Sequence, residues 1–199
     1  MFVGAFLIGI GLHTNLIHLP FARAIDASFP EALSTDRGFV GAVHTVSVAK
    51  VMKNTGQSIV NGIPTTQFQV QIIKNIKGTL PERVVLQQSG GYENGVLITM
   101  EEQPLLKAGS TYLLSTRTDG KGMYLVSAYT RGTILLSADQ KLTTTQLLAI
   151  STANKDVIAL RNAYATELPF DIDVQNTATF NSFIKTVTIP STPISPQTW

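Results

Sequence analysis

The sequence predicts a mainly β protein, built as an antiparallel barrel or sandwich and followed by an amphipathic α-helix. Alternating apolar and polar residues indicate several strands, and short glycine-containing turns join the later ones with no helix between them. Residues 142–164 then carry apolar side chains at spacings of three and four, without glycine or proline. Strands that follow one another through short turns usually pair as antiparallel neighbours, which favours a closed or two-layered β fold.

Composition indicates one domain that is held together by packing and carries little charge. The chain has 199 residues, of which 14% are charged, and it contains no cysteine. Lysine and arginine total 15 against 13 acidic residues, so loss of Arg23 with an N-terminal leader would leave 14 against 13. A nearly neutral domain lacks the basic stripe that nucleic-acid phosphates select, so no nucleic-acid partner is expected.

Residues 1–24 are predicted to be a secretory signal peptide. An apolar run passes Pro20 and ends at Ala22-Arg23-Ala24, where the small alanines suit a signal peptidase that cuts after Ala24. We therefore expect a secreted or cell-surface protein. Export without disulfides is typical of Gram-positive bacteria, and the absence of cysteine favours that source.

The leader has no lysine or arginine before its apolar run, which leaves two further interpretations open. Translation starts upstream of Met1, or the segment stays attached as a membrane anchor close to the minimum of about 20 apolar residues. His13 and His18 make its second half polar, which favours cleavage. A membrane partner is expected only if the leader remains uncut.

The expected order after the leader is a connecting arm over 25–38, a barrel over 39–136, a C-terminal helical extension packing on the barrel over 137–189 and a disordered tail over 190–199. Alternation predicts the strands of the barrel, and clusters of glycine, asparagine and proline predict its main loops at 54–64 and 89–95. The strands are expected at 39–52, 65–76, 82–88, 96–100, 111–117, 123–128 and 133–136.

The helix over 142–164 has a recognisable beginning. Thr143 is followed three residues later by Gln146, the spacing of a capping box in which each side chain bonds a free backbone N–H of the first turn. Ser151-Thr152 is the place where a break into two helices is expected.

Three phrases of the sequence carry a resemblance to a known group of proteins. They are Ile-Lys-Asn-Ile-Lys-Gly-Thr-Leu-Pro at 73–81, Gln-Gln-Ser-Gly-Gly at 87–91 and Pro-Leu-Leu-Lys-Ala-Gly-Ser-Thr-Tyr-Leu-Leu at 104–114. In this order they resemble a family of exported bacterial modules of unassigned activity, similar to small OB-like barrels. The resemblance covers about 39–136 and implies an OB-like antiparallel β-barrel.

The same phrases are more distantly similar to the netrin-like domains of metalloproteinase inhibitors. Those inhibitors block a catalytic zinc with the amine and carbonyl of an N-terminal cysteine. This chain has no cysteine, so the resemblance does not bring that mechanism with it. The bacterial modules imply no catalytic residue either.

Residue types that support catalysis or metal binding are scarce. His44 is the only histidine that remains after the expected cleavage, and a Ser-His-Asp arrangement would need it as the base. A structural role is the expected one. The adjacent Glu101 and Glu102 would face opposite sides of an extended segment, and Asp171 and Asp173 lack the repeat and glycine of a calcium loop. We expect no catalytic residue, metal or cofactor.

The loop at 89–95 contains the candidate ligand-binding residues Tyr92, Glu93 and Asn94. No Gly-Lys-Ser/Thr sequence follows Gly90-Gly91, so the pair does not predict a phosphate site; it predicts tight backbone with positive φ. An exposed tyrosine beside it would offer a flat surface on which a ligand stacks.

The sequence therefore favours a non-enzymatic exported binding module at the bacterial cell surface. Residues 39–136 hold nine basic and five acidic side chains, a surplus of four that allows weak association with an anionic envelope polymer; a protein is the other expected partner. The alternative is a regulator or inhibitor of a secreted protease that does not act by cysteine–zinc chelation.

Overall fold

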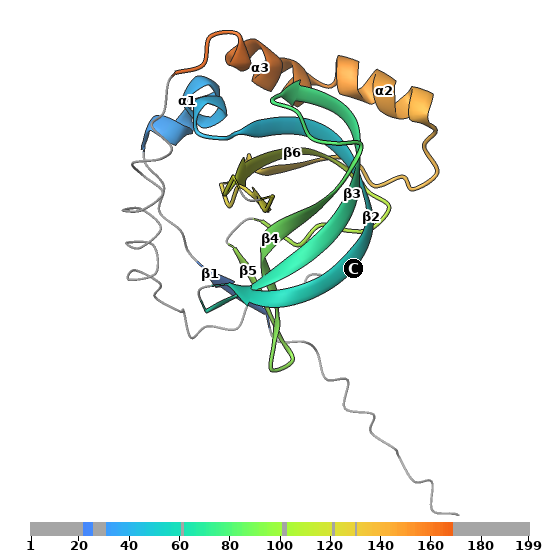
Figure 1. The fold of residues 1–199 in the computed structure, drawn as a ribbon. Helices are drawn as coiled ribbons and strands as arrows, with labels where there is room; N and C mark the ends of the chain where they lie inside the picture. Colours follow the sequence, from blue (N-terminus) through green and yellow to red (C-terminus); the bar gives the residue numbers. More distant parts are fainter. Residues whose placement is uncertain are drawn as a thin grey trace, which may run out of the picture.

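The chain folds into a closed five-stranded β-barrel with short helices gathered at one end (Figure 1). The computed structural model describes residues 22–25, 31–60, 62–100, 103–120, 122–129 and 131–168. The prediction of a mainly β fold with an OB-like barrel and a following helical part is confirmed, and the barrel rather than the sandwich is the form adopted. Most of the expected leader, the end of the helical extension and the tail lie outside the described residues.

Five strands close the barrel in the order β2–β3–β4–β7–β6 and back to β2. They are β2 (Thr45–Val60), β3 (Ile63–Lys77), β4 (Arg83–Glu93), β6 (Thr111–Thr118) and β7 (Tyr124–Val126). Neighbours are antiparallel except β4 and β7, whose parallel contact closes the ring. This parallel pair is the one departure from the expected antiparallel barrel. β5 and β6 come between β4 and β7 in the chain, so no hairpin turn forces β4 and β7 to run in opposite directions.

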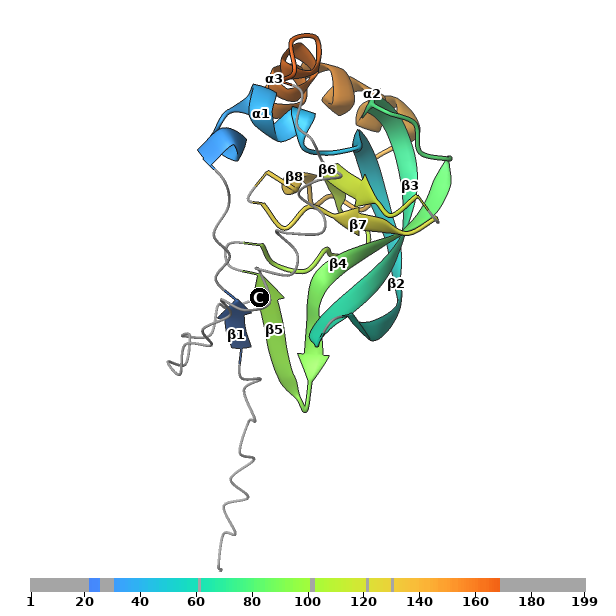
Figure 2. The same cartoon turned by 60° about the vertical axis from the view of Figure 1, so that its left-hand side comes forward.

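Three shorter strands of the described residues extend the sheet beyond the ring. β5 (Val96–Met100) forms a hairpin with β4, and β1 (Ala22–Ile25) lies parallel to β5 on its other edge. β8 (Thr133–Ser137) pairs with β6. Figure 2 shows the β4–β5 hairpin at the end of the barrel opposite the helices. One end of the barrel is therefore covered by helices, and the other end carries the hairpin.

β2 and β3 form one long bulged hairpin, which corrects the loop expected at 54–64. Their pairing continues to Val60 and Ile63, and register shifts interrupt it at several points. Each bulge bends the strand and raises its twist, as closure of a small barrel requires. Gly56 lies beside one shift, and Pro64 pairs with Ile59 inside the hairpin. Both residue types are typical of loops, but here the glycine accommodates a bulge and the proline occupies an edge position of a strand.

A helical segment precedes β2 where the sequence suggested an arm and the start of a strand. A 3₁₀ turn (η1, Glu31–Ser34) leads to helix α1 (Asp36–Gly41), so the strand expected from Phe39 begins at Thr45 instead. The Thr35 hydroxyl caps the helix by accepting the N–H of Gly38 at 3.1 Å. Phe39 and Val40 are buried there, and this packing overrides their preference for a strand.

In the part of the chain that the structure describes, two helices follow the barrel, α2 (Thr144–Ala153) and α3 (Lys155–Tyr164). The predicted capping box of Thr143 and Gln146 is confirmed. The break falls at Asn154 and not at Ser151-Thr152, because the Asn154 side chain caps α3 by accepting the N–H of Asp156 at 2.8 Å. No helix in the described ranges combines the length and the apolar character needed to cross a bilayer.

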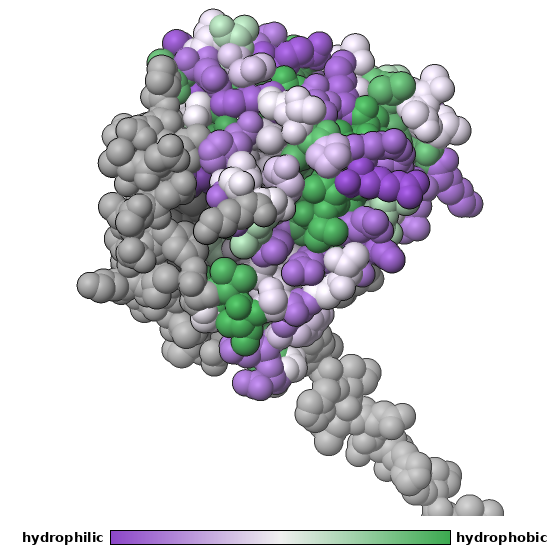
Figure 3. Space-filling model, viewed as in Figure 1, coloured by the Kyte–Doolittle hydropathy of each residue, from purple (hydrophilic) through white to green (hydrophobic). Residues whose placement is uncertain are grey.

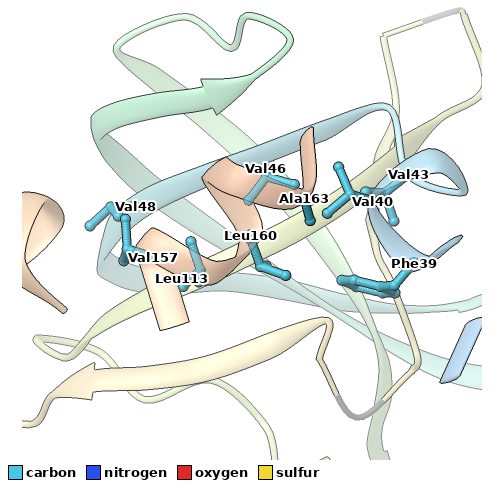
Figure 4. Close-up of a cluster of buried hydrophobic side chains, with 9 residues drawn as sticks. All are labelled: Phe39, Val40, Val43, Val46, Val48, Leu113, Val157, Leu160 and Ala163. Atoms are coloured by element: carbon cyan, nitrogen blue, oxygen red, sulfur yellow. The ribbon is translucent and has the colours of Figure 1, made fainter. Parts of the chain in front are cut away.

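Among the described residues, two buried clusters hold the fold together. One joins α1 and α3 to the outside of the barrel wall (Figure 4), and the other fills the barrel between β2, β3, β4 and β6. Alternation explains the division, since Val46 and Val48 of β2 belong to the first cluster and Ala49 and Val51, after a register shift, belong to the second. The long strand thus has apolar residues on both faces.

Polar contacts fasten the segment after α3 to the same wall. The Lys77 ammonium donates to the carbonyl of Val40 at 2.7 Å, forms an ion pair with Glu167 and lies 5.7 Å from the centre of the Tyr164 ring. Arg37 donates to the carbonyl of Thr166 at 2.6 Å. The end of the described chain is therefore tied to β3 and α1 together.

Leu160→Ala tests whether α3 is part of the core. Leu160 is 2% exposed in the cluster of Figure 4, so its truncation should lower the free energy of unfolding by about 2–5 kcal/mol. The matched control is Leu148→Ala, since Leu148 of α2 is 44% exposed and its loss should change stability by less than about 0.5 kcal/mol. Urea unfolding of the full chain measures both, and equal losses would contradict this packing.

Candidate functional site

Tyr92, Glu93 and Asn94 lie at the tip of the β4–β5 hairpin, far from the helical end (Figure 2). The loop expected at 89–95 is wrong in extent, because β4 continues to Glu93 and only Asn94-Gly95 forms the turn. Both turn residues have positive φ, 50° and 79°, as a two-residue hairpin turn requires. Asparagine and glycine tolerate this conformation best, which explains why the turn is so short.

The side chain of Gln57 fixes the backbone of Tyr92. Its Oε1 accepts the N–H of Tyr92 at 2.7 Å, and its Nε2 donates to the Tyr92 carbonyl. Pairing between β3 and β4 ends at Thr65 and Gly90, so the amide of Gln57 takes the place of a neighbouring strand. The hairpin is thereby held to the end of β2, although Gln57 and Tyr92 are 35 residues apart.

Glycine beside Tyr92 makes this contact possible. A Cβ at position 91 would collide with the Gln57 amide and come within 3.0 Å of the Thr66 hydroxyl. Gly90 has φ 117°, which confirms the expected positive φ, and a Cβ there would lie 2.9 Å from the Ile98 carbonyl. The pair therefore serves close packing and does not loosen the hairpin.

The fixed backbone presents an exposed apolar surface. Tyr92 is 54% exposed and Ile59, two residues beyond Gln57 on β2, is 64% exposed. Residues two apart lie on the same face of a strand, so Ile59 and Gln57 share one face of β2. Glu93 and Asn94 follow Tyr92 in the chain and are exposed, so a carboxylate and an amide adjoin the tyrosine.

Several basic residues of the barrel are engaged inside the fold. Lys50 donates to the carbonyl of Gln140 at 2.8 Å, Arg131 forms an ion pair with Asp36, and Lys77 holds the segment after α3. The basic surplus noted in the sequence is therefore partly used in structural contacts. Glu93 is the charged residue that adjoins Tyr92 in the chain.

His44 has a structural contact in the barrel wall. The N–H of Thr118 donates to its Nδ1 at 2.9 Å. In a Ser-His-Asp triad the same nitrogen carries a proton and donates to the carboxylate. The observed bond reverses that direction, which supports the structural role expected for His44.

The expected carboxylate pairs are not brought into any described site. Glu101, Glu102, Asp171 and Asp173 lie outside the described residues. Among the residues that are described, no three histidine, aspartate or glutamate side chains cluster where they could hold a metal ion.

Sequence reasoning found Tyr92 but missed Gln57 and Ile59. Both were placed in an expected loop, and nothing in the local pattern marks a glutamine that bonds a backbone 35 residues away. Only the length of the bulged hairpin brings the two ends together.

Family models and curated proteins offer no relative that guides an assignment. No family model matches the chain, and no curated protein matches it. Arguments about function rest on the residues themselves.

Gln57→Ala tests the Gln57 clamp, the pair of hydrogen bonds by which this side chain holds the backbone of Tyr92. Loss of the side chain frees the N–H of Tyr92, so we expect hydrogen exchange at that amide to rise about tenfold or more, with a stability loss of about 0.5–1.5 kcal/mol at most. Gln69→Ala, on the outward face of β3, is the matched control and should leave exchange at Tyr92 unchanged. Slow exchange at Tyr92 in both variants would rule out the clamp.

Proposed function

We propose that the chain is a non-enzymatic exported binding module that acts at the bacterial cell surface, with Tyr92, Glu93 and Asn94 in contact with its partner. The observation that carries the proposal is the exposed Tyr92 on a backbone held by Gln57. An exposed aromatic ring on an ordered backbone is typical of binding surfaces, where tyrosine is enriched.

A tyrosine on a fixed backbone suits binding for a physical reason. Tyrosine offers a large contact area with only two side-chain torsions to restrain, and a hairpin that is already ordered loses little entropy when a partner docks. The Gln57 clamp supplies that order.

A protein is favoured over an anionic envelope polymer as the partner. Glu93 adjoins Tyr92 and would repel polymer phosphates, while Lys50, Lys77 and Arg131 are engaged in internal contacts. A mixed apolar and acidic tip instead suits a protein surface with a complementary basic rim.

Regulation of a secreted protease is the second candidate. The β4–β5 hairpin projects from the barrel (Figure 2), and a projecting hairpin with a fixed backbone has a form that fits a protease cleft. Because the chain lacks cysteine, such inhibition would have to work without the chelation used by netrin-like inhibitors.

Tyr92→Ala tests the proposed site in the exported protein. Retention on envelopes isolated from the producing cells should fall about tenfold, the range of an aromatic contact residue, with the unfolding free energy unchanged within about 0.5 kcal/mol. Leu135→Ala is the control, because Leu135 is 55% exposed on β8, away from the hairpin. Equal retention of all three proteins would refute the site.

Two treatments separate the candidate functions. Protease digestion of the envelopes should abolish retention if the partner is a protein and preserve it if the partner is a polymer. Inhibition of the secreted proteolytic activity of the same cells, weakened by Tyr92→Ala, would favour the regulator.

A further inference from the structure

We propose that the edge of β5 now covered by β1 is a strand-addition site, which the removal of residues 1–24 opens to an extended segment of a protein partner. The inference rests on the proposed function, since it supposes export and a protein partner. It adds the part of the surface that is recognised and the chemistry of the segment.

β5 is a strand whose composition requires a cover. Its sequence is Val-Leu-Ile-Thr-Met, without charge, proline or glycine, and Ile98 and Met100 are buried. Proteins usually protect open edges with lysine, proline or a bulge, and a bare apolar edge pairs with other chains. β5 has none of those devices; β1 covers the edge instead.

The register shows which groups the edge offers. β1 lies parallel to β5, with Ala22 opposite Leu97 and Ile25 opposite Met100. On the other side, Tyr92 pairs with Leu97 while both backbone groups of Tyr92 are bonded to Gln57. In an antiparallel ladder the backbone groups of Leu97 then point away from β4, so the N–H groups of Leu97 and Thr99 face β1.

The expected cleavage site falls inside the cover. A cut after Ala24 removes three residues of β1 and leaves only Ile25, which is too short to hold a parallel pairing. The backbone groups of Leu97 and Thr99 then lose their neighbours. Processing therefore exposes an apolar, hydrogen-bonding edge on the hairpin that carries Tyr92.

The register also shows what an occupant of this edge should carry. It places position 23 opposite Ile98, which is 9% exposed. An apolar residue at that position would fit better. The expected partner segment is extended, runs parallel to β5 and carries apolar residues opposite Ile98 and Met100; only a polypeptide supplies this ladder.

Hydrogen exchange on the full chain, before and after cleavage by signal peptidase, tests the opening. We expect the amides of Leu97 and Thr99 to exchange about tenfold faster or more after cleavage, because each loses a ladder bond. The amides of Ile98 and of β8 are internal controls and should not change. Unchanged exchange at Leu97 and Thr99 overturns the proposal, and so does loss of protection throughout the barrel.

A peptide probe tests the occupant on the cleaved protein. A synthetic peptide with the sequence of residues 19–27 should restore slow exchange at Leu97 and Thr99, and its Arg23→Val form should do so at a several-fold lower concentration. The peptide carrying both Arg23→Pro and Ala24→Pro should not bind, since proline cannot donate to the ladder.

Other results would overturn the inference. Failure of the first two peptides to protect β5 would do so, and so would dimerisation of the cleaved protein with Leu97 and Thr99 protected, because the occupant would then be a second copy. The proposed function fails separately, when Tyr92→Ala leaves envelope retention unchanged even though β5 opens and binds the peptide.

Discussion

The short parallel contact between β4 and β7 is the interaction on which the rest of the structure depends. Only two residue pairs make it, Leu86 with Tyr124 and Gln87 with Leu125, yet it closes the ring and so defines an inside. Without it the sheet would stay open along β4, and the buried cluster between β2, β4 and β6 would face water. Closure also decides where the free edges of the sheet lie.

β4 changes its neighbour part-way along its length because of that closure. One edge follows β3, while the other meets β7 first and β5 afterwards. Gln88 lies between the two partners and is fully buried; its amide donates to the carbonyl of Pro104 at 3.0 Å and accepts the N–H of Leu106 at 2.9 Å. A side chain thus replaces the missing strand, as Gln57 does at Tyr92.

Periodicity was enough to predict most of the strands and the capped helix. It failed where two signals conflicted. Gly56 and Pro64 are typical of loops, but a tightly curved hairpin uses the same residues as bulge and edge. Phe39 and Val40 suit a strand, yet the Thr35 cap and the packing against α3 make them helical.

The candidate site was predictable only in part for a related reason. The exposure of Tyr92 could be predicted from the turn-forming residues that surround it in the sequence. The bond to Gln57 depends on how far the β2–β3 hairpin coils, which is a property of closure and not of local sequence. β1 is likewise not predictable from local sequence. Its residues resemble the end of a leader, and its partner strand is distant in the chain, with Ala22 opposite Leu97, a separation that no local pattern spans.

The exposed tyrosine and the covered edge belong to one continuous surface. Tyr92 and Leu97 are directly opposite each other, and Tyr92 turns its backbone groups to Gln57, so theirs is the non-hydrogen-bonded pairing in which side chains approach most closely. The same register continues from Leu97 to Ala22 of β1. A row of side-chain positions therefore runs across β4, β5 and the strand beside them. A segment that replaced β1 would place one of its residues next to Leu97, in line with the Tyr92 ring. The Gln57 clamp, the hairpin and the edge would then act together, because Gln57 holds β4, β4 pairs with β5, and the incoming backbone pairs with β5.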